Sequence, residues 1–318
     1  MFRDIVHHSP DCKENGNFKV DLRKIVELAR HQDATSDSVK VLNLTAVAFH
    51  ESRCGSTLVA NSFIAMDPTK HRTYSESAPG AQALRNVCGE SFRRCSLEQA
   101  AKLLQDTVYM MSRTNDLQEE RVFYKFQSIT TKSIQVFQAA FPQVPWLFVY
   151  RDPVQVMMSH IKDDPTMSHA ICTRTKQNPP PDINQIAQRH HLSNAKHFSK
   201  EEYCAAHLAG ITEAAVRRLN DYAIPVNYDG LMDTLMEEIF PRIWGRPLST
   251  MELDNIKTIS QTYSKGRGDR HKEFKGDSEA KNKAASTAVK EAAELILKQS
   301  YDSLETFTSK FMEQPLPQ

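Results

Sequence analysis

Short apolar segments alternate with amphipathic ones along most of the chain. Residues 39–49 are rich in Val, Leu and Ala and predict a strand buried on both faces, as in a parallel sheet. Strands that alternate with helices predict an α/β fold of three layers, a mainly parallel sheet with helices on both faces. The further strands are expected at 72–75, 122–126, 146–150 and 224–227, and the helices at 22–30, 58–65, 97–113, 131–140, 154–161 and 200–219.

The chain length and this alternation together predict a single domain over residues 1–318. Residues 1–38 are polar and are expected to form an N-terminal extension. Residues 167–200 interrupt the alternation, because they contain three consecutive prolines and little periodicity, and they predict a long loop or lid. Residues 278–318 are expected to be a C-terminal helical segment, with a helix rich in Ala, Lys and Glu over 278–298.

Composition narrows the range of partners. The 40 basic and 39 acidic residues nearly cancel, which argues against a nucleic-acid partner held by overall charge, so any anion site must be local. The apolar runs are far shorter than the roughly 18 residues that a membrane span requires. The first residues lack the layout of a signal peptide, which predicts a cytoplasmic location, or a soluble lumenal one if the chain is part of a longer protein. The six cysteines are scattered and predict free thiols.

A tight loop joins the first strand to the following helix. Arg53 brings a positive charge, and Gly55 lets the main chain approach a ligand. Ser56 and Thr57 add hydroxyls and amides at a helix N-terminus, and the order strand, loop, helix is that of a phosphate-cradling loop. The pattern for ATP or GTP would need glycine at position 50 and lysine at position 56, and the chain has neither. The loop is therefore P-loop-like but suited to one phosphate.

Residues 52–58, Ser-Arg-Cys-Gly-Ser-Thr-Leu, resemble the 5′-phosphosulfate loop of sulfotransferases, except that cysteine stands where the family most often has serine. The resemblance implies the family's fold and its cofactor, 3′-phosphoadenosine 5′-phosphosulfate, which becomes 3′-phosphoadenosine 5′-phosphate. An ordinary helix cap is the alternative for such a short Gly-Ser-Thr turn. The residues that the resemblance implies in cofactor binding are Arg53, Cys54, Gly55, Ser56, Thr57 and Leu58.

A second segment supports this resemblance. Residues 148–160 are similar to the family's 3′-phosphate segment, in which a strand ends in an arginine and the next helix carries a serine two turns on. Arg151 would offer a forked guanidinium, Pro153 would start the helix, and Ser159 would face the same anion. Alone, this segment would be interpreted as a helix start with a surface arginine; its place about a hundred residues after the first motif favours the anion site.

Two later segments resemble family motifs more loosely. Residues 263–269 are similar to the basic loop that closes over the 3′-phosphate and adenine, which implies binding by Lys265, Gly266 and Arg267; a solvated basic loop is the alternative. Residues 226–231 resemble a stretch after a strand, which implies that Tyr228 lies against adenine; a core tyrosine is the alternative. The interrupted segment 167–200 would then serve as a lid or bind the acceptor.

Sulfuryl transfer is an in-line displacement that needs a base for the acceptor and cations near the leaving nucleotide. Arg53 and Lys125 are the candidate cations, and Lys125 resembles the family's strand-end lysine. Cytosolic members place a catalytic histidine two residues after that lysine, but this chain has Gln127. Glu76 matches the glutamate base of the tyrosylprotein type and of several bacterial or Golgi types, and His50 is the reserve candidate.

The sequence thus predicts a sulfotransferase of the glutamate-base type that acts on a hydroxyl or amine of a small-molecule, carbohydrate or peptide acceptor. No metal is expected, because His190, His191, His197 and His207 lack a carboxylate or cysteine partner at ligand spacing. A P-loop kinase or nucleotide hydrolase is the alternative enzyme, and a catalytically inactive nucleotide-binding module is the alternative without catalysis. The acceptor and the oligomeric state are left open.

Overall fold

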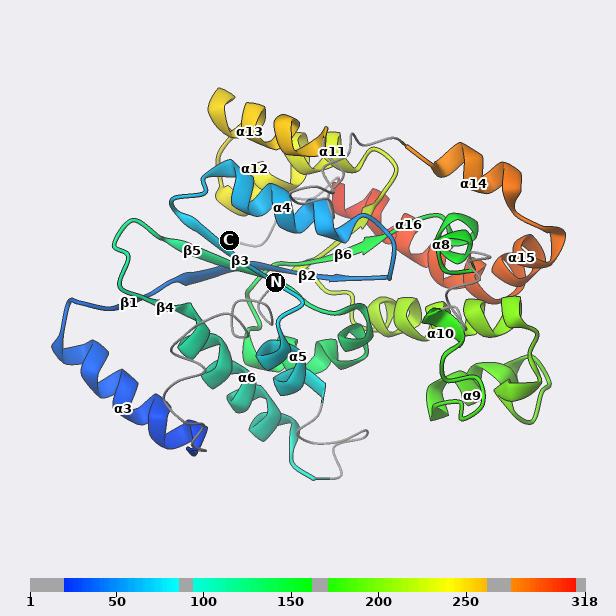
Figure 1. Cartoon of the computed structure of the whole chain (residues 1–318), viewed down its shortest axis with the longest axis horizontal. Coiled ribbons are helices and arrows are strands. Elements are labelled where there is room, and N and C mark those ends of the chain that lie inside the picture. Colours follow the sequence, from blue (N-terminus) through cyan, green and yellow to red (C-terminus); the bar gives the residue numbers. More distant parts are fainter. Residues whose placement is uncertain (1–19, 86–93, 162–170, 262–275, 313–318) are drawn as a thin grey trace, which may run out of the picture.

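A computed structural model describes residues 20–85, 94–161, 171–261 and 276–312. Its centre is a sheet of five parallel strands, which runs across the molecule in Figure 1. The strand order is β3 (His71–Ser75), β5 (Arg121–Lys125), β2 (Asn43–His50), β6 (Trp146–Tyr150) and β7 (Ala223–Asn227). A small antiparallel sheet pairs β1 (Lys40–Val41) with β4 (Arg113–Thr114).

Helices cover both faces of the sheet (Figure 1). One face carries α4 (Ser56–Met66), α11 (Leu231–Thr234), α12 (Phe240–Trp244) and α13 (Thr250–Ser260). The other carries α5 (Ala78–Arg85), α6 (Leu97–Ser112), α7 (Ile134–Ala140) and α10 (Lys200–Val216), while α16 (Lys298–Met312) contacts β7. The remaining helices are α3 (Leu22–Thr35) on α6, and α8 (Pro153–His160), α9 (Pro181–Arg189), α14 (Ser278–Ala284) and α15 (Thr287–Ala292) at one end of the sheet. Short turns of 3₁₀ helix span Ser128–Ser133, Ile171–Thr173 and Ala195–His197, and π-helical turns span Leu235–Ile239 and Ala293–Leu297.

The central strand shows why the sheet is buried on both faces. Ala46 and Ala48 of β2 pack toward α4, while Val47 and Phe49 pack in the core on the opposite face. Successive side chains of a strand point to opposite faces, so a strand covered on both sides must be apolar throughout. The predicted three-layer α/β fold with a parallel sheet is confirmed, and so are the five strands that the apolar runs predicted.

The segment expected to be a long loop is folded over the part that the structure describes. It contains α9 and two turns of 3₁₀ helix, and Ile183, Ile186 and Ala187 of α9 are buried. The run of prolines was expected to break regular structure, but Pro181 is the first residue of α9, where its missing N–H costs nothing. The expectation of an irregular loop is therefore wrong over 171–197, and a role as a lid stays a prediction.

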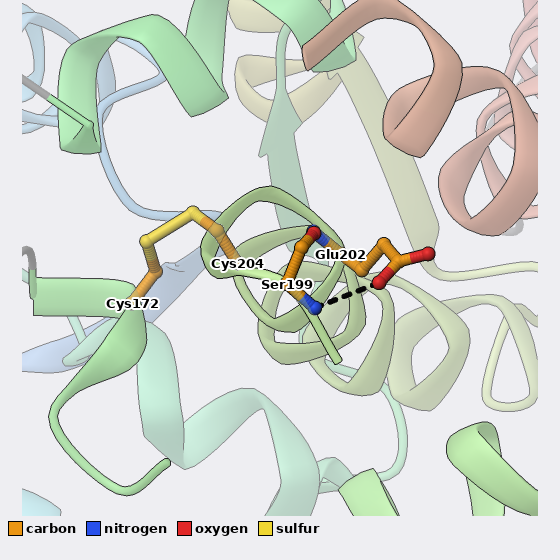
Figure 2. Close-up of a disulfide and its surroundings, with 4 residues drawn as sticks. All are labelled: Cys172, Ser199, Glu202 and Cys204. Carbon is orange, nitrogen blue, oxygen red and sulfur yellow. Dashed lines mark hydrogen bonds between the residues drawn. A yellow bond between two sulfur atoms is a disulfide. The ribbon is translucent and has the colours of Figure 1, made fainter. Parts of the chain in front are cut away.

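The prediction of free thiols is wrong for three cysteines. Cys172, in the 3₁₀ turn before α9, and Cys204, in α10, form a disulfide beside the Ser199–Glu202 capping box at the start of α10 (Figure 2). Cys95 is also disulfide-bonded, whereas Cys54 is a buried free thiol. The residues of the described disulfide are 32 positions apart, so only the packing of their elements brings them together. None of the described helices is long and apolar enough to cross a membrane.

Candidate active site

The carboxyl ends of the parallel strands define the place where a ligand would bind. Strands β3 and β5 lie on one side of β2, and β6 and β7 lie on the other, so the connections diverge between β2 and β6. Ligands of open α/β sheets bind beyond the strand ends at such a divergence. The loop after β2 and the Arg151 side chain after β6 both stand there. The Glu51 N–H donates to the Val149 carbonyl (3.0 Å) and so joins the ends of these two neighbouring strands.

The loop of residues 51–55 turns sharply into α4. Gly55 caps that helix with a φ of 84°, and a Cβ atom added to it would lie 2.5 Å from Cδ2 of Tyr228. Only glycine combines that left-handed backbone with so close an approach. Arg53 is also left-handed, with a φ of 68°, and within the described part of the chain it makes no ion pair. The loop therefore presents a cation and the first N–H groups of α4.

Cys54, in the same loop, faces the core and not the site. Its single S–H has two carbonyl acceptors within reach, those of Glu51 (3.0 Å) and Val149 (3.1 Å), and burial raises its pKa to about 12. Leu58 is buried as well. If these two residues bind the cofactor, as the sequence predicts, they do so through the main chain.

The predicted 3′-phosphate residues gather around Arg151. Its buried guanidinium donates from Nε to Oε1 of Gln155 (2.7 Å) and lies 4.1 Å from the centre of the Tyr228 ring. Ser159, one turn beyond Gln155 on α8, is buried and donates to the Gln155 carbonyl (2.9 Å). The structure thus brings Arg151 and Tyr228 together with Gly55, and Ser159 lies on the same helix as Gln155.

The candidate catalytic residues meet where β3, β5 and β2 end. The Glu76 carboxylate forms an ion pair with the Lys125 ammonium, and Nε2 of His50 lies 3.8 Å from the same carboxylate oxygen. The Lys125 side chain is 2% exposed and that of Glu76 is 40% exposed, so the carboxylate is the member of the pair that a solvent-borne acceptor can reach. Nε2 of His50 also lies 3.0 Å from the Phe126 carbonyl, which positions the buried ring.

Sequence reasoning missed Glu51 and Gln155. Glu51 is buried under the loop and accepts hydrogen bonds from the Thr212 hydroxyl (2.7 Å) and the Arg151 N–H (3.3 Å); burial raises its pKa to about 7. Gln155 stands in the first turn of a predicted helix, four residues after Arg151, and its nearness to Arg151 along the chain could have identified it. Nothing in the sequence around Glu51 distinguishes it from an exposed glutamate.

Asp277 and Lys281 are two further charged residues that the sequence analysis missed. Asp277 accepts a hydrogen bond from the Arg151 guanidinium (2.8 Å), although 126 positions separate the two residues. The predicted ligands Lys265, Gly266 and Arg267 lie outside the described residues, so their role stays a prediction. Over the described residues, no group of three or more His, Cys, Asp or Glu side chains is arranged to hold a metal ion.

Comparison with known proteins gives structural likeness only. No family model matches the chain, and no curated protein matches its sequence. Similar solved structures include a sulfotransferase from Mycobacterium avium (10% identity, TM-score 0.42, covering 81% of this chain and 79% of that one). They also include the sulfotransferase domain of the curacin biosynthetic pathway (11%, 0.40, 87% and 100%) and a sulfotransferase from Alicyclobacillus acidocaldarius (12%, 0.41, 85% and 97%). At this level of likeness they identify neither the ligand nor the reaction of this chain.

Proposed function

We propose that this chain is a sulfotransferase that moves a sulfuryl group from 3′-phosphoadenosine 5′-phosphosulfate to a hydroxyl or amine of an acceptor. One observation carries the proposal. The loop after β2, the Arg151–Tyr228 contact and the Glu76–Lys125 ion pair meet at the carboxyl edge of one parallel sheet. The first two are anion-binding features and the third pairs a base with a cation, which is the set of groups that group transfer from a nucleotide needs.

The residues at the strand ends fit such a cofactor. Arg53 and the first amides of α4 would hold the 5′-phosphosulfate, and Arg151 and Ser159 would hold the 3′-phosphate. Tyr228, whose ring packs against Gly55, would lie beside the adenine. The fit is supported by the charge of Arg53, which no described carboxylate neutralises, and by Gly55, whose missing side chain lets the Tyr228 ring pack against the loop. The cofactor, when bound, supplies the sulfuryl group and the nucleotide leaving group.

The chain's own residues then have separate tasks. Glu76 accepts the proton of the acceptor hydroxyl or amine, because its carboxylate is open to solvent and held beside Lys125. Lys125 and Arg53 offset negative charge that develops on the leaving side during transfer. His50 lies against the Glu76 carboxylate and is the second candidate for the base. Acceptors to be tested are small molecules, carbohydrates and peptides.

The disulfide supports an oxidising compartment for this enzyme. Structural disulfides persist in secreted proteins and in the lumen of the secretory pathway, and they are rare in reducing cytosol. The Cys172–Cys204 bond therefore favours the lumenal location over the cytoplasmic one that the sequence also allowed. The test is to label free thiols in the protein from its natural source, unfolded without a reductant, and to locate the labelled cysteines. Labelled thiols at positions 172 and 204 would contradict the inference.

Cofactor choice is the decisive experiment for the function. In a thermal-shift assay, 3′-phosphoadenosine 5′-phosphate should raise the melting temperature in the presence of EDTA, because a ligand that binds only the folded state stabilises it. ATP with magnesium should not, since the loop has no lysine for the β and γ phosphates. Arg151→Ala should abolish most of the shift, and Arg189→Ala, which removes an exposed arginine paired with Glu213, should leave it unchanged. Preferential stabilisation by magnesium-ATP would favour a kinase or nucleotide hydrolase instead.

A further inference from the structure

The Arg151 guanidinium, a predicted ligand of the 3′-phosphate, already has hydrogen-bond acceptors within the chain itself. Its Nη2 donates to Oδ1 of Asp277 (2.8 Å) and to the hydroxyl of Ser278 (2.9 Å). The other carboxylate oxygen of Asp277, Oδ2, lies 2.6 Å from the ammonium of Lys281, one turn further along α14. One carboxylate therefore bridges two cations from distant parts of the chain, through one oxygen each.

The geometry of Asp277 differs from that of a structural cap. Asp277 is the residue before α14, a position where aspartate usually accepts a hydrogen bond from the first turn of the helix, but its side chain makes no such bond. Its carboxylate turns toward the cations instead. The Arg151 and Lys281 side chains are only 5% and 14% exposed, whereas Asp277 is 52% exposed. The cations are thus held inside, and the anion lies on the solvent side, where a ligand could displace it.

We propose that Lys281 is a further ligand of the cofactor's 3′-phosphate, beside Arg151, and that the Asp277 carboxylate takes the place of that phosphate in the cofactor-free chain. The inference rests on the proposed function and extends its 3′-phosphate site to α14. An exposed carboxylate that bridges the buried Arg151 and the mostly buried Lys281 reproduces contacts that a phosphate monoester would make.

The local charge favours this exchange. Arg151 and Lys281 carry two positive charges against the single negative charge of Asp277, while a phosphate monoester carries about −1.5 to −2 near neutral pH. The pKa of Lys281 is lowered, mainly by burial and further by the positive charges of Arg151 and Arg53. The contact with Asp277 acts in the opposite direction and raises this pKa. Lys281 therefore stands within the same cationic cluster as the two predicted anion-binding arginines, and a more highly charged anion than a carboxylate would balance the cluster better.

The test separates the 3′-phosphate from the rest of the nucleotide. Titration calorimetry would compare 3′-phosphoadenosine 5′-phosphate with adenosine 5′-phosphate, which lacks the 3′-phosphate, on the wild type and three variants. Lys281→Ala should weaken binding of the bisphosphate about tenfold, as expected for one charge-assisted contact, and leave the monophosphate unchanged. Asp277→Asn should tighten binding of the bisphosphate by about threefold, because the competing anion is gone. Lys283→Ala, an exposed lysine of the same helix, is the matched control and should change neither affinity.

The outcomes test the role of Lys281, the role of Asp277 and the proposed function separately. If Lys281→Ala, folded by circular dichroism, weakens both nucleotides equally or neither, Lys281 is not a ligand of the 3′-phosphate. If Asp277→Asn weakens the bisphosphate, the carboxylate positions the cations and does not stand in for the phosphate. A wild-type chain that fails to bind the bisphosphate at all overturns the proposed function itself. If the wild type binds it, but Lys281→Ala leaves the ratio of the bisphosphate and monophosphate affinities unchanged, only the role of Lys281 is overturned.

Discussion

Glu76 adopts a left-handed backbone, with a φ of 55°, which costs a residue other than glycine about 1–2 kcal/mol. Among the described residues, only Arg53 and His191 share this property without being glycine, and two of the three stand at the candidate site. Lys125 holds Glu76 in place twice, since its carbonyl accepts the Glu76 N–H (2.7 Å) and its ammonium pairs with the carboxylate. Strain of this kind is concentrated at functional sites.

The role of Glu76 can be tested by a change that keeps its shape. Glu76→Gln should lower turnover by roughly 10²–10⁴-fold, because the amide cannot accept a proton, while binding of 3′-phosphoadenosine 5′-phosphate should persist. Turnover would be measured with labelled donor, after a panel of sugars, phenols, peptides and sterols has yielded an acceptor. Glu119→Gln, which breaks the ion pair with Arg72, is the matched control.

Wild-type turnover by the Glu76 variant would show that the base lies elsewhere, and His50→Ala would be the next variant. Gln127→His should not rescue Glu76→Gln, since a base must lie within hydrogen-bond reach of the proton that it takes.

Glu51 should make stability depend on pH. Burial raises its pKa from an ordinary value of 4.5 to about 7, so between these pH values the folded chain keeps a proton that the unfolded chain has lost. The contribution of Glu51 to the free energy of unfolding is fully present below pH 4.5. It falls by about 3 kcal/mol as the pH rises from 4.5 through 7. Glu51→Gln, which resembles the protonated acid, should therefore lose less stability than the wild type between pH 5 and 8 in urea unfolding.

Glu252 provides the control for this effect. It is also a buried glutamate, but hydrogen bonds from Arg246 lower its pKa to about 2, so it stays ionised from pH 5 to 8. Glu252→Gln should lower stability by the same amount at every pH in that range. Parallel curves for wild type and Glu51→Gln would mean that Glu51 does not hold its proton in the folded state.

At the scale of elements, the segment around α9 is held by a core of its own. Ile183 and Ile186 of α9 pack in a cluster with residues of α8, α10 and α15, apart from the two cores of the sheet. The Cys172–Cys204 disulfide adds a covalent tie between the turn before α9 and α10. This end of the molecule is thus cross-linked to the helix whose Thr212 hydroxyl donates to Glu51 under the loop after β2.

Removing that disulfide should destabilise the folded chain. A cross-link between residues 32 positions apart restricts the unfolded chain by an amount worth roughly 3–4 kcal/mol. Cys172→Ala combined with Cys204→Ala should lower the free energy of unfolding by about this much in urea under non-reducing conditions. Cys54→Ala, which removes a buried thiol without a cross-link, is the control for lost packing. Equal losses in the two variants would show that packing, not the cross-link, supplies the stability.

Over the whole molecule, strand order and burial predict that the centre of the sheet is the part most protected from hydrogen exchange. Strand β2 has a parallel strand on each side and helices over both faces, whereas β1 belongs to a two-stranded sheet with Val41 exposed. Amides of β2 and β6 should therefore exchange with solvent only through global unfolding, and those of β1 and β4 through local opening.

Amide hydrogen exchange measured with and without 3′-phosphoadenosine 5′-phosphate tests whether this ligand binds the folded chain. A ligand that binds only the folded chain should slow exchange at β2 and β6 by one common factor, set by the ratio of ligand concentration to its dissociation constant. Exchange at β1 and β4, which lie away from the strand ends where the ligand would bind, should hardly change. Slowing that is confined to the loop after β2, with none in the strands, would contradict global protection by binding.

The sequence by itself determined the features that depend on neighbours along the chain. The apolar runs of β2, β5 and β6 predicted buried parallel strands. The glycine at position 55 indicated the turn, and the proline at position 153 indicated the start of α8. Arg151 and Glu76 were identified by resemblance to sulfotransferase motifs, and each follows a predicted strand, so that both were expected at the carboxyl edge of a parallel sheet.

Only the tertiary structure decided which distant residues share that edge. The Asp277 carboxylate on Arg151, the Thr212 hydroxyl on Glu51 and the Cys172–Cys204 bond join residues far apart in sequence. No local pattern specifies such pairs, because they result from how the helices pack against the sheet and one another. The same packing buries Glu51 and raises its pKa, so even the chemistry of a single carboxyl group depends on the assembled fold.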